Sequence, residues 1–281
     1  MQDAPILIIG RNAKTGWRVD RRLQALGHMT RAVSRSTTPT FDWQAPHTWR
    51  EAMAGTRAAY VTFHPDLAIP SAEQTIREFV TLAAELGLEH LVLLSGRGED
   101  GARRAERVLE QSGLDWNIVR ASWFMQNFSE SFMLDGILKG ELMLPAGDIA
   151  EPFIDVDDLA DVAVAVLTRP ELRNRVFELS GPRAMTFAQC ATAISGVTGY
   201  PVRYTRVPVE RFLDALRAQG ADQPLLWLMH ELFTKVLDGR NSQPTSGVVE
   251  ALGRPATDFD DYLSKVVASG TWQRQSARAS A

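Results

Sequence analysis

Short apolar runs and helical stripes alternate along the first half of the chain. Apolar runs of four to six residues, such as ILII at 6–9 and HLVLLS at 90–95, are typical of parallel strands buried on both faces. The stretch from Thr15 to Leu26 instead repeats its apolar residues at helical spacing and stops at Gly27. The strands predicted in this half are 6–9, 29–35, 58–63, 90–95 and 116–120. The helices predicted between them are 15–26, a short stretch near 49–53, 71–86 and 101–111.

Strands that alternate with helices in this way predict a parallel sheet with helices on both faces. The connections are expected to be right-handed, as they are in almost all such units. We therefore predict an α/β fold built on a Rossmann-type, doubly wound parallel sheet.

The second half is less regular. The run PFIDVDDLADVAVAVL predicts a short strand and then a helix capped by Asp155 or Asp157. Further on we predict a strand at 175–181, a helix at 186–198 capped by Thr186, a strand at 202–207 and two helices within 208–237. The sequence shows no internal repeat, and no linker divides it into two independent domains. We expect a main domain at 1–150 and a smaller α+β substrate-binding part at 151–281, packed on the first, interleaved with it, and ending in a polar tail that frays from Gly270.

The loop GRNAKTG, at 10–16, lies between the first predicted strand and the first predicted helix. A nucleotide-hydrolysing loop needs Gly-x4-Gly-Lys-Ser/Thr, but here alanine precedes Lys14 and Gly10 is one residue too close to it. Gly10, Ala13 and Gly16 do fit Gly-x-x-Gly-x-x-Gly with one substitution, which is the looser pattern of dinucleotide-binding reductases. A strand-to-helix turn without a ligand is the alternative.

If the loop binds a dinucleotide, each small residue has a physical role. Gly10 allows the tight turn, Gly16 lets the helix pack closely, and the free N–H groups near Lys14 face a pyrophosphate. The predicted cofactor-binding residues are Gly10, Arg11, Asn12, Ala13, Lys14, Thr15, Gly16, Ser34, Arg35, Thr62 and Phe63.

The end of the second strand favours NADPH over NADH. An NAD site usually has a carboxylate there for the ribose 2′-hydroxyl, whereas this strand ends in Ser34 and Arg35. An arginine can pair with a 2′-phosphate and stack on adenine, and Arg11 could add a second positive charge. The alternative for Arg35 is a solvated surface side chain.

Composition narrows the possible partners. The net charge of −4 argues against nucleic acid or an anionic membrane as a partner. A single cysteine excludes an intramolecular disulfide and a thiolate metal site, and the five histidines lack metal-binding spacing. The N-terminal run does not have the pattern of a signal peptide, and no run reaches the roughly 18 apolar residues of a membrane span. We expect a cytoplasmic protein, a monomer or weak homo-oligomer without a metal.

The usual proton-donating pair of short-chain reductases, Tyr-x-x-x-Lys, is absent, because none of the four tyrosines has a lysine four residues later. Residues at the carboxyl ends of the strands face the ligand crevice in such sheets. His64 could donate a proton there, and Ser95 could hydrogen-bond a substrate or the nicotinamide ribose. A surface histidine and a capping serine are the alternatives.

The run SWFMQNF, at 122–128, is rich in aromatic and amide side chains. Trp123, Phe124 and Asn127 could form the wall of a pocket for a small aromatic substrate, or the two aromatic rings could belong to the core. The run PLLWLMHELF, at 224–233, is interpreted as a core helix in preference to a pocket lining.

Taken together, several motifs resemble the NmrA-type branch of the atypical short-chain reductases, over about residues 4–210. They are GRNAKTG, SRS, FDW, VLLSGRGE, AERVLEQSGLDWNIVRASWFMQNFSE, LPAGD, FIDVDDLADVA and FELSGPRAMTF. Within that branch the chain is most similar to the flavin-free NAD(P)H azoreductases. It departs from the usual pattern at Ala13, where the family has glycine.

The resemblance implies an NADPH-preferring enzyme that reductively cleaves aromatic azo compounds to amines by hydride transfer, without flavin. It also implies that the glycine loop holds the pyrophosphate and that Ser34 and Arg35 hold the 2′-phosphate. Two alternatives stay open. One is an NAD(P)H-dependent reductase of quinones or enones, and the other is an NADP-sensing regulator that performs no chemistry.

Overall fold

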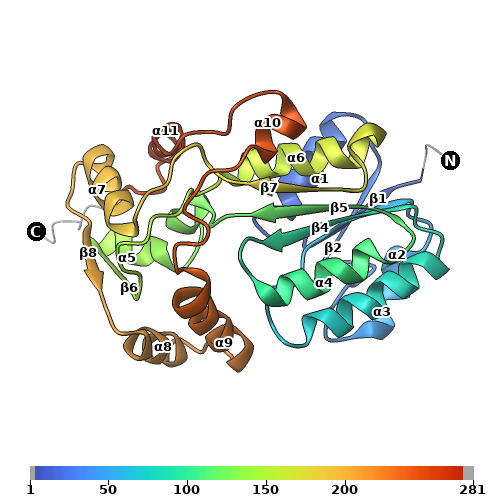
Figure 1. Ribbon diagram of the computed structural model, residues 1–281, viewed down its shortest axis with the longest axis horizontal. Helices are drawn as coiled ribbons and strands as arrows, with labels where there is room; N and C mark the ends of the chain where they lie inside the picture. Colours follow the sequence, from blue (N-terminus) through green and yellow to red (C-terminus); the bar gives the residue numbers. More distant parts are fainter. Residues whose placement is uncertain (1–3, 275–281) are drawn as a thin grey trace, which may run out of the picture.

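Six parallel strands form the main sheet of the structure, a computed structural model that describes residues 4–274 (Figure 1). The strand order is β2-β1-β3-β4-β5-β7, so the chain reverses direction across the sheet between β1 and β3. A crevice for ligands forms at such a reversal, outside the carboxyl ends of the strands. The strands are β1 (Ile6–Ile9), β2 (Thr30–Val33), β3 (Ala58–Val61), β4 (His90–Gly96), β5 (Asp115–Ala121) and β7 (Arg175–Leu179).

Helices cover both faces of this sheet, which confirms the Rossmann-type α/β fold (Figure 1). One face carries α1 (Gly16–Ala25), α6 (Val156–Thr168) and α10 (Gly247–Leu252). The other carries α2 (Trp49–Met53), α3 (Ala72–Glu85) and α4 (Asp100–Glu110). Both faces of β1 are therefore buried: Leu7 and Ile9 join one hydrophobic cluster, and Ile6 and Ile8 join the other. This burial explains why the strand is a continuous apolar run.

A smaller lobe lies beside the main sheet (Figure 1). Its two parallel strands are β6 (Glu141–Leu144) and β8 (Arg203–Arg206). Its helices are α5 (Met133–Lys139), α7 (Phe187–Thr198), α8 (Val209–Ala218), α9 (Gln223–Glu231) and α11 (Phe259–Ser269). The short helical segments are η1 (Pro46–Thr48), η2 (Met125–Phe128), η3 (Pro170–Leu172) and the π-helical η4 (Leu232–Val236).

The predicted caps of the second half are confirmed, with one choice resolved. Asp155 is the N-cap of α6 and accepts a hydrogen bond from the N–H of Asp157 at 2.9 Å. Thr186 caps α7 in a reciprocal capping box with Gln189. The short strand expected just before α6 is wrong, because Ile154 makes only an isolated bridge.

The boundary expected at residue 150 does not separate the two lobes. The small lobe begins before it, with α5 and β6, whereas α6, β7 and α10 come after it and belong to the main sheet. The two parts are thus interleaved along the chain. The fraying expected from Gly270 is wrong for its first residues, because Trp272 is buried and its indole N–H donates to the carbonyl of Phe128. The rest of that tail, 275–281, lies outside the described residues.

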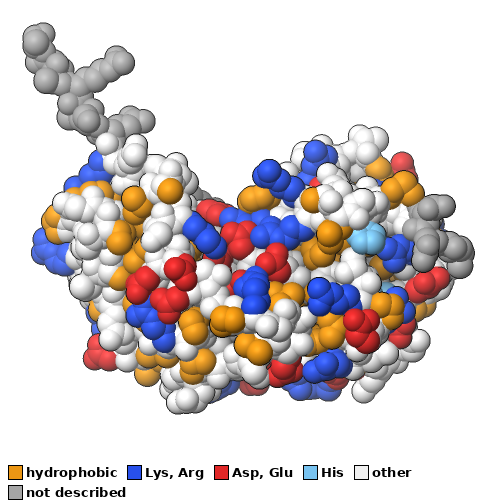
Figure 2. Space-filling view, turned by 90° about the horizontal axis from the view of Figure 1, so that it is seen from above, with side chains coloured by type: hydrophobic (Ala, Val, Ile, Leu, Met, Phe, Trp, Pro, Cys, Tyr) orange, Lys and Arg blue, Asp and Glu red, His pale blue; other side chains and the backbone are white. Residues whose placement is uncertain are grey.

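Ion pairs connect both α1 and Arg254, just after α10, to α6. Arg22 donates to Asp161 at 2.7 Å and to Asp157 at 2.8 Å, while Arg254 donates to Asp158 at 2.7 Å and to Asp161 at 2.6 Å. Figure 2 shows acidic and basic side chains intermingled over the middle of the face seen from above. Such partly exposed pairs contribute little each, and the helices pack mainly through their apolar stripes.

A buried histidine joins the amino ends of three strands. His90, which begins β4, hydrogen-bonds through Nε2 to Oδ1 of Asn117 at 2.9 Å. The amide of Asn117 donates in turn to the carbonyls of Leu172 and Arg175. Nδ1 of His90 has no partner among the described residues, and burial lowers the pKa of this imidazole to about 4.

This imidazole predicts acid sensitivity between about pH 6.5 and 4. In that window the unfolded chain binds a proton at His90 and the folded chain does not, so the free energy of unfolding falls as the pH falls. The full effect is on the order of 3 kcal/mol. Urea unfolding across this window should show a shallower pH slope for His90→Gln. The exposed control His47→Gln should keep the slope of the native protein, and an unchanged slope in His90→Gln would contradict the assignment.

Candidate functional site

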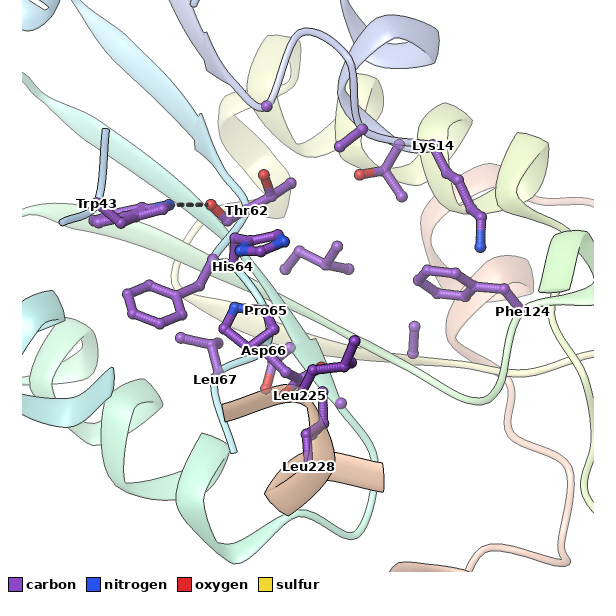
Figure 3. Close-up of a pocket in the computed structure, with 18 of the residues that line it drawn as sticks. Lys14, Trp43, Thr62, His64, Pro65, Asp66, Leu67, Phe124, Leu225 and Leu228 are labelled. Carbon is purple, nitrogen blue, oxygen red and sulfur yellow. Dashed lines mark hydrogen bonds between the residues drawn. The ribbon is translucent and has the colours of Figure 1, made fainter. Parts of the chain in front are cut away.

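A cavity of about 1010 Å³ opens at the carboxyl ends of the main-sheet strands (Figure 3). One wall is formed by the loop after β1 and the ends of β2 and β3, and another by α9 and η4 of the small lobe. The cavity therefore lies at the reversal of strand order, where α/β sheets bind their ligands.

The loop between β1 and α1 is built on two close backbone approaches. Gly10 has a φ of +89°, and a Cβ added there would lie 2.4 Å from Oγ1 of Thr62. A Cβ added at Gly16 would lie 2.1 Å from the carbonyl oxygen of Gly10. Both positions therefore require glycine. Ala13 fits, because among the described non-glycine residues only Asn174 has a positive φ.

This loop leaves backbone donors free at the start of α1. The carbonyl of Val33 accepts the N–H groups of Gly10 and Arg11, which ties the turn to β2. The N–H groups of Asn12, Lys14 and Thr15 have no acceptor within residues 4–274. Free N–H groups at the positive end of a helix dipole form an anion site, and a pyrophosphate fits this arrangement.

The end of β2 provides hydroxyl groups and a guanidinium. The hydroxyls of Ser34 and Ser36 lie 3.1 Å apart, and the amide of Asn12 donates to Ser36 at 3.4 Å. Arg35 is exposed and lines the same part of the cavity. Arg11 does not line the cavity, and neither does Gly16, whose role is the close packing of α1.

Trp43, from the connection between β2 and η1, forms an aromatic wall beside this end. Its indole N–H donates to the carbonyl of Thr62 at 2.9 Å, and its ring centroid lies 4.8 Å from that of Phe63 (Figure 3). Asp42 and Gln44 line the cavity next to it. Sequence reasoning missed these three residues as cavity residues, although the run FDW, at 41–43, was an available signal for Asp42 and Trp43.

Lys14 connects the loop to the opposite wall of the cavity. Its ammonium donates to Oδ1 of Asn127, on η2, at 2.9 Å. Burial lowers the pKa of Lys14, an effect that Glu130 opposes and Arg18 reinforces. The predicted phosphate loop and the predicted substrate wall are thus joined by one hydrogen bond.

The two residues predicted to be catalytic have different surroundings. His64 is exposed at the cavity, beside Thr62, and its ring has no hydrogen-bond partner among residues 4–274 (Figure 3). Ser95 also lines the cavity, but it is buried and its hydroxyl donates to Glu106 at 2.6 Å. Arg120 holds the same carboxylate at 2.6 Å. The hydroxyl proton of Ser95 is thus already used within the protein.

The predicted substrate wall faces the cavity. Trp123, Phe124 and Asn127 all line it, and the ring of Trp123 also packs on Phe187 and Phe233. Both alternatives weighed for these aromatic residues therefore hold in part.

The interpretation of 224–233 as a core helix alone is wrong. Helix α9 and η4 place Leu225, Leu228, Met229 and Leu232 against the cavity, opposite the loop, while Phe233 is in the core (Figure 3). Periodicity shows that such a helix is apolar, but it does not show which part of the apolar face borders a cavity.

Sequence reasoning also missed two acidic residues of the cavity, Asp66 and Glu99. Glu99 is only 7% exposed, and one of its carboxylate oxygens has no partner in the described part of the chain. Within that part, no cluster of three or more His, Cys, Asp or Glu side chains could hold a metal ion. No described helix is long and apolar enough to span a membrane.

Curated proteins similar to this chain extend over most of its length. The NAD(P)H azoreductase of Xenophilus azovorans is 28% identical over 281 residues, covering 92% of this chain and 96% of the relative. The Prestalk A differentiation protein A of Dictyostelium discoideum is 26% identical over 256 residues, covering 90% of this chain and 83% of the relative.

Solved structures share the fold. The Citrobacter sp. triphenylmethane reductase complexed with NADP(H) superposes with a TM-score of 0.78 at 17% identity, covering 93% of this chain and 99% of that one. The NADPH-dependent quinone oxidoreductase QOR2 of Escherichia coli, complexed with NADPH, gives a TM-score of 0.77 at 18% identity with the same coverage. At these identities the likeness establishes the fold alone.

A family model decides the relationship. It is described as the NmrA-like family, and it matches residues 103–256, more than half of the chain. The chain belongs to the NmrA-like family.

Proposed function

We propose that the cavity binds a nicotinamide dinucleotide, with NADPH preferred to NADH, and that the protein is an NAD(P)H-dependent oxidoreductase. The observation that carries this proposal is the loop at 10–16, whose free N–H groups lie at the start of α1 and beside the end of β2. The residues present fit the dinucleotide, because the two glycines remove the side chains that would block this close approach.

Each part of the cavity has the chemistry for one part of the dinucleotide. The loop residues Asn12, Lys14 and Thr15 would hold the pyrophosphate through backbone N–H groups. Ser34 and Arg35 would hold the 2′-phosphate, since hydroxyl and guanidinium groups bind phosphate oxygens. The remaining residues assigned to the dinucleotide are Gly10, Ala13, Thr62, Phe63 and the newly found Trp43.

When bound, the dinucleotide supplies a hydride. The apolar wall of Trp123, Phe124, Leu225 and Leu228 would exclude water from the acceptor and favour an aromatic one. We propose an aromatic azo compound as that acceptor. The relative from Xenophilus azovorans, which is named an NAD(P)H azoreductase, supports this choice.

Azo cleavage to two amines requires four electrons, and therefore two hydrides and two protons. A hydride reaches one azo nitrogen, and a proton reaches the other. A second cycle cleaves the N–N bond of the hydrazo product. The chain must supply or relay the protons, because the tyrosine–lysine pair of other reductases is missing. His64 is one candidate for this role.

The decisive experiment mixes purified protein, NADPH and an azo dye without flavin, and follows both absorbances. We expect two NADPH consumed for each dye cleaved. Consumption of one NADPH per dye would contradict the two-cycle reaction. Oxidation with quinones or enones but not with azo dyes would replace the substrate and keep the reductase. Dinucleotide binding without oxidation by any acceptor would instead favour a regulator.

Arg35→Ala tests the preference for NADPH. Loss of one charge-assisted contact to the 2′-phosphate should raise the KM for NADPH about 10-fold or more. The KM for NADH should change little, because NADH lacks that phosphate. Arg21→Ala, an exposed arginine on α1, is the matched control. An equal rise for both dinucleotides would contradict the role given to Arg35.

Gly16→Ala and Ala13→Gly test the loop. The first places a methyl group 2.1 Å from the carbonyl of Gly10, so dinucleotide affinity should be lost and stability should fall by about 1–3 kcal/mol. The second removes a methyl group from a residue with ordinary backbone angles, so affinity should stay equal or improve. Gly196→Ala, in open space on α7, is a control that should not destabilise. Titration calorimetry and urea unfolding provide the readouts, and loss of binding in Ala13→Gly would contradict the loop assignment.

A further inference from the structure

Two carboxyl groups meet on the cavity wall without a basic partner. Asp66 follows the end of β3, and Glu99 immediately precedes α4. A Cβ added at Gly96, the last residue of β4, would lie 2.1 Å from Oε1 of Glu99, so the carboxyl lies directly over that glycine. The absence of a side chain at Gly96 makes room for a carboxyl group at the carboxyl end of a central strand, where catalytic groups of such sheets gather.

The hydrogen bonds of the two carboxyl groups differ. Oδ1 of Asp66 accepts a hydrogen bond from the N–H of Ala68 at 2.8 Å. The carboxyl groups of Asp66 and Glu99 share a hydrogen bond that shifts the pKa of each. Oε2 of Glu99 has no partner in the described part of the chain. Glu99 is also the N-cap residue of α4, but its side chain caps no N–H of that helix. The helix start, which would favour an anion, is therefore not used by this carboxyl group.

The surrounding charges are mostly acidic. Glu106 of α4 and Glu231 of α9 both act on Glu99 and disfavour its ionisation. Arg97 is close in sequence, but its guanidinium donates to Ser122 and to backbone carbonyls of the connection between η4 and α10, and it pairs with Glu178. Arg240, which donates to the carbonyl of Gly98, pairs with Asp238. Neither Asp66 nor Glu99 forms an ion pair among residues 4–274.

Two adjacent carboxyl groups, of which Glu99 is buried and Asp66 half-buried, do not both ionise readily at neutral pH, because their like charges repel in a medium of low dielectric constant. Burial raises the pKa of Asp66, while its bonds to Glu99 and Ala68 favour the ionised form. Burial also raises the pKa of Glu99, and the charge of Asp66 raises it further. Glu99 therefore keeps the proton, and Asp66 is the ionised partner that accepts its hydrogen bond.

We propose that Asp66 and Glu99 form an acid pair that stores one proton and delivers it to the reduced substrate. This role rests on the proposed function. Figure 3 shows Asp66 below Pro65, toward the side of the cavity that α9 closes. Asp66 therefore lies toward the part of the cavity assigned to the aromatic acceptor, away from Lys14 of the predicted phosphate loop, and Glu99 lines the same cavity.

The proton balance is complete. After a hydride has reached one azo nitrogen, the other nitrogen carries the electron pair of the former π bond. The O–H bond of the acid pair breaks and an N–H bond forms at that nitrogen. Two adjacent carboxylates remain, and their repulsion drives uptake of a proton from water. This restores the donor for the second cycle.

Infrared spectroscopy tests the stored proton without any reaction. At pH 7 the native protein should show the C=O band of a protonated carboxyl group, which shifts in deuterium oxide. Glu106 and Glu151, whose pKa burial raises to about 7, contribute equally to both spectra, so the difference spectrum between the native protein and Glu99→Gln should isolate the band of Glu99. Asp66→Asn should shift that band, because it removes the carboxylate that accepts the proton of Glu99. Glu89→Gln, an exposed glutamate, is the control that should retain the band. Both test variants are nearly isosteric and relieve a repulsion, so the thermal unfolding temperature should not fall. Absence of the band from the difference spectrum between the native protein and Glu99→Gln would overturn the proposal.

Steady-state and single-turnover kinetics test delivery of the proton. Glu99→Gln, Asp66→Asn and the double variant should each lower kcat for an azo dye by about 100-fold or more, with the KM for NADPH unchanged. In the native protein kcat should fall as the pH rises past the apparent pKa of the pair. Unchanged kcat in both single variants, or an equal loss in His64→Ala alone, would overturn the proposal. If none of the acceptors tested led the native protein to oxidise NADPH, the proposed function would be contradicted, and the donor role with it. A persisting infrared band would still show the stored proton.

Discussion

The site depends on one constraint, the close backbone contact between Gly10, just after β1, and Gly16, at the start of α1. The carbonyl of Gly10 lies where a side chain of residue 16 would be, and the hydroxyl of Thr62 lies where a side chain of residue 10 would be. These two approaches fix three neighbouring elements, β1, β3 and α1, relative to one another. As a result the amino end of α1 points its free N–H groups at the cavity, and the end of β2 lies beside it.

Local sequence patterns predict many of the elements that build this arrangement. The run ILII predicts a strand buried on both faces, and β1 is such a strand. Thr186 predicts a helix start, and α7 begins there with its capping box. These features depend on residues a few positions apart, which is why they can be predicted. The fold class and the NmrA-like family could be predicted for the same reason, since the motifs that indicate them are contiguous in sequence, and both predictions are confirmed.

The parts that sequence reasoning missed depend on distant residues meeting. Asp66 and Glu99 each look like an ordinary solvated acid in the sequence, and only the fold brings their carboxyl groups together on one wall of the cavity. Leu225 and Leu228 look like core residues, because one apolar stripe serves both a core and a cavity. The same limitation explains Ser95: its position after a strand predicts a cavity residue, but the sequence does not show that Glu106 takes its proton.

Two buried glutamates, Glu99 just before α4 and Glu106 within it, differ in the partners of their carboxyl groups. Glu106 forms ion pairs with Arg120 and Arg103, which oppose the rise that burial causes in its pKa, to about 7. Glu99, at the start of the same helix, has a second carboxyl group as its neighbour and no cation among the described residues. Environment rather than residue type therefore separates a structural ion pair from an acid that keeps its proton.

The interleaving of the two lobes limits how the protein can be divided. The small lobe consists of three chain segments, around α5 and β6, around α7 to α9, and around α11. Between these segments the chain returns to the main sheet, where it forms α6, β7 and α10. A chimera joined at any single point would split a sheet or leave a face of it bare. Exchanging the substrate-binding lobe with that of a relative would therefore mean transplanting all three segments together and keeping α6, β7 and α10 in place.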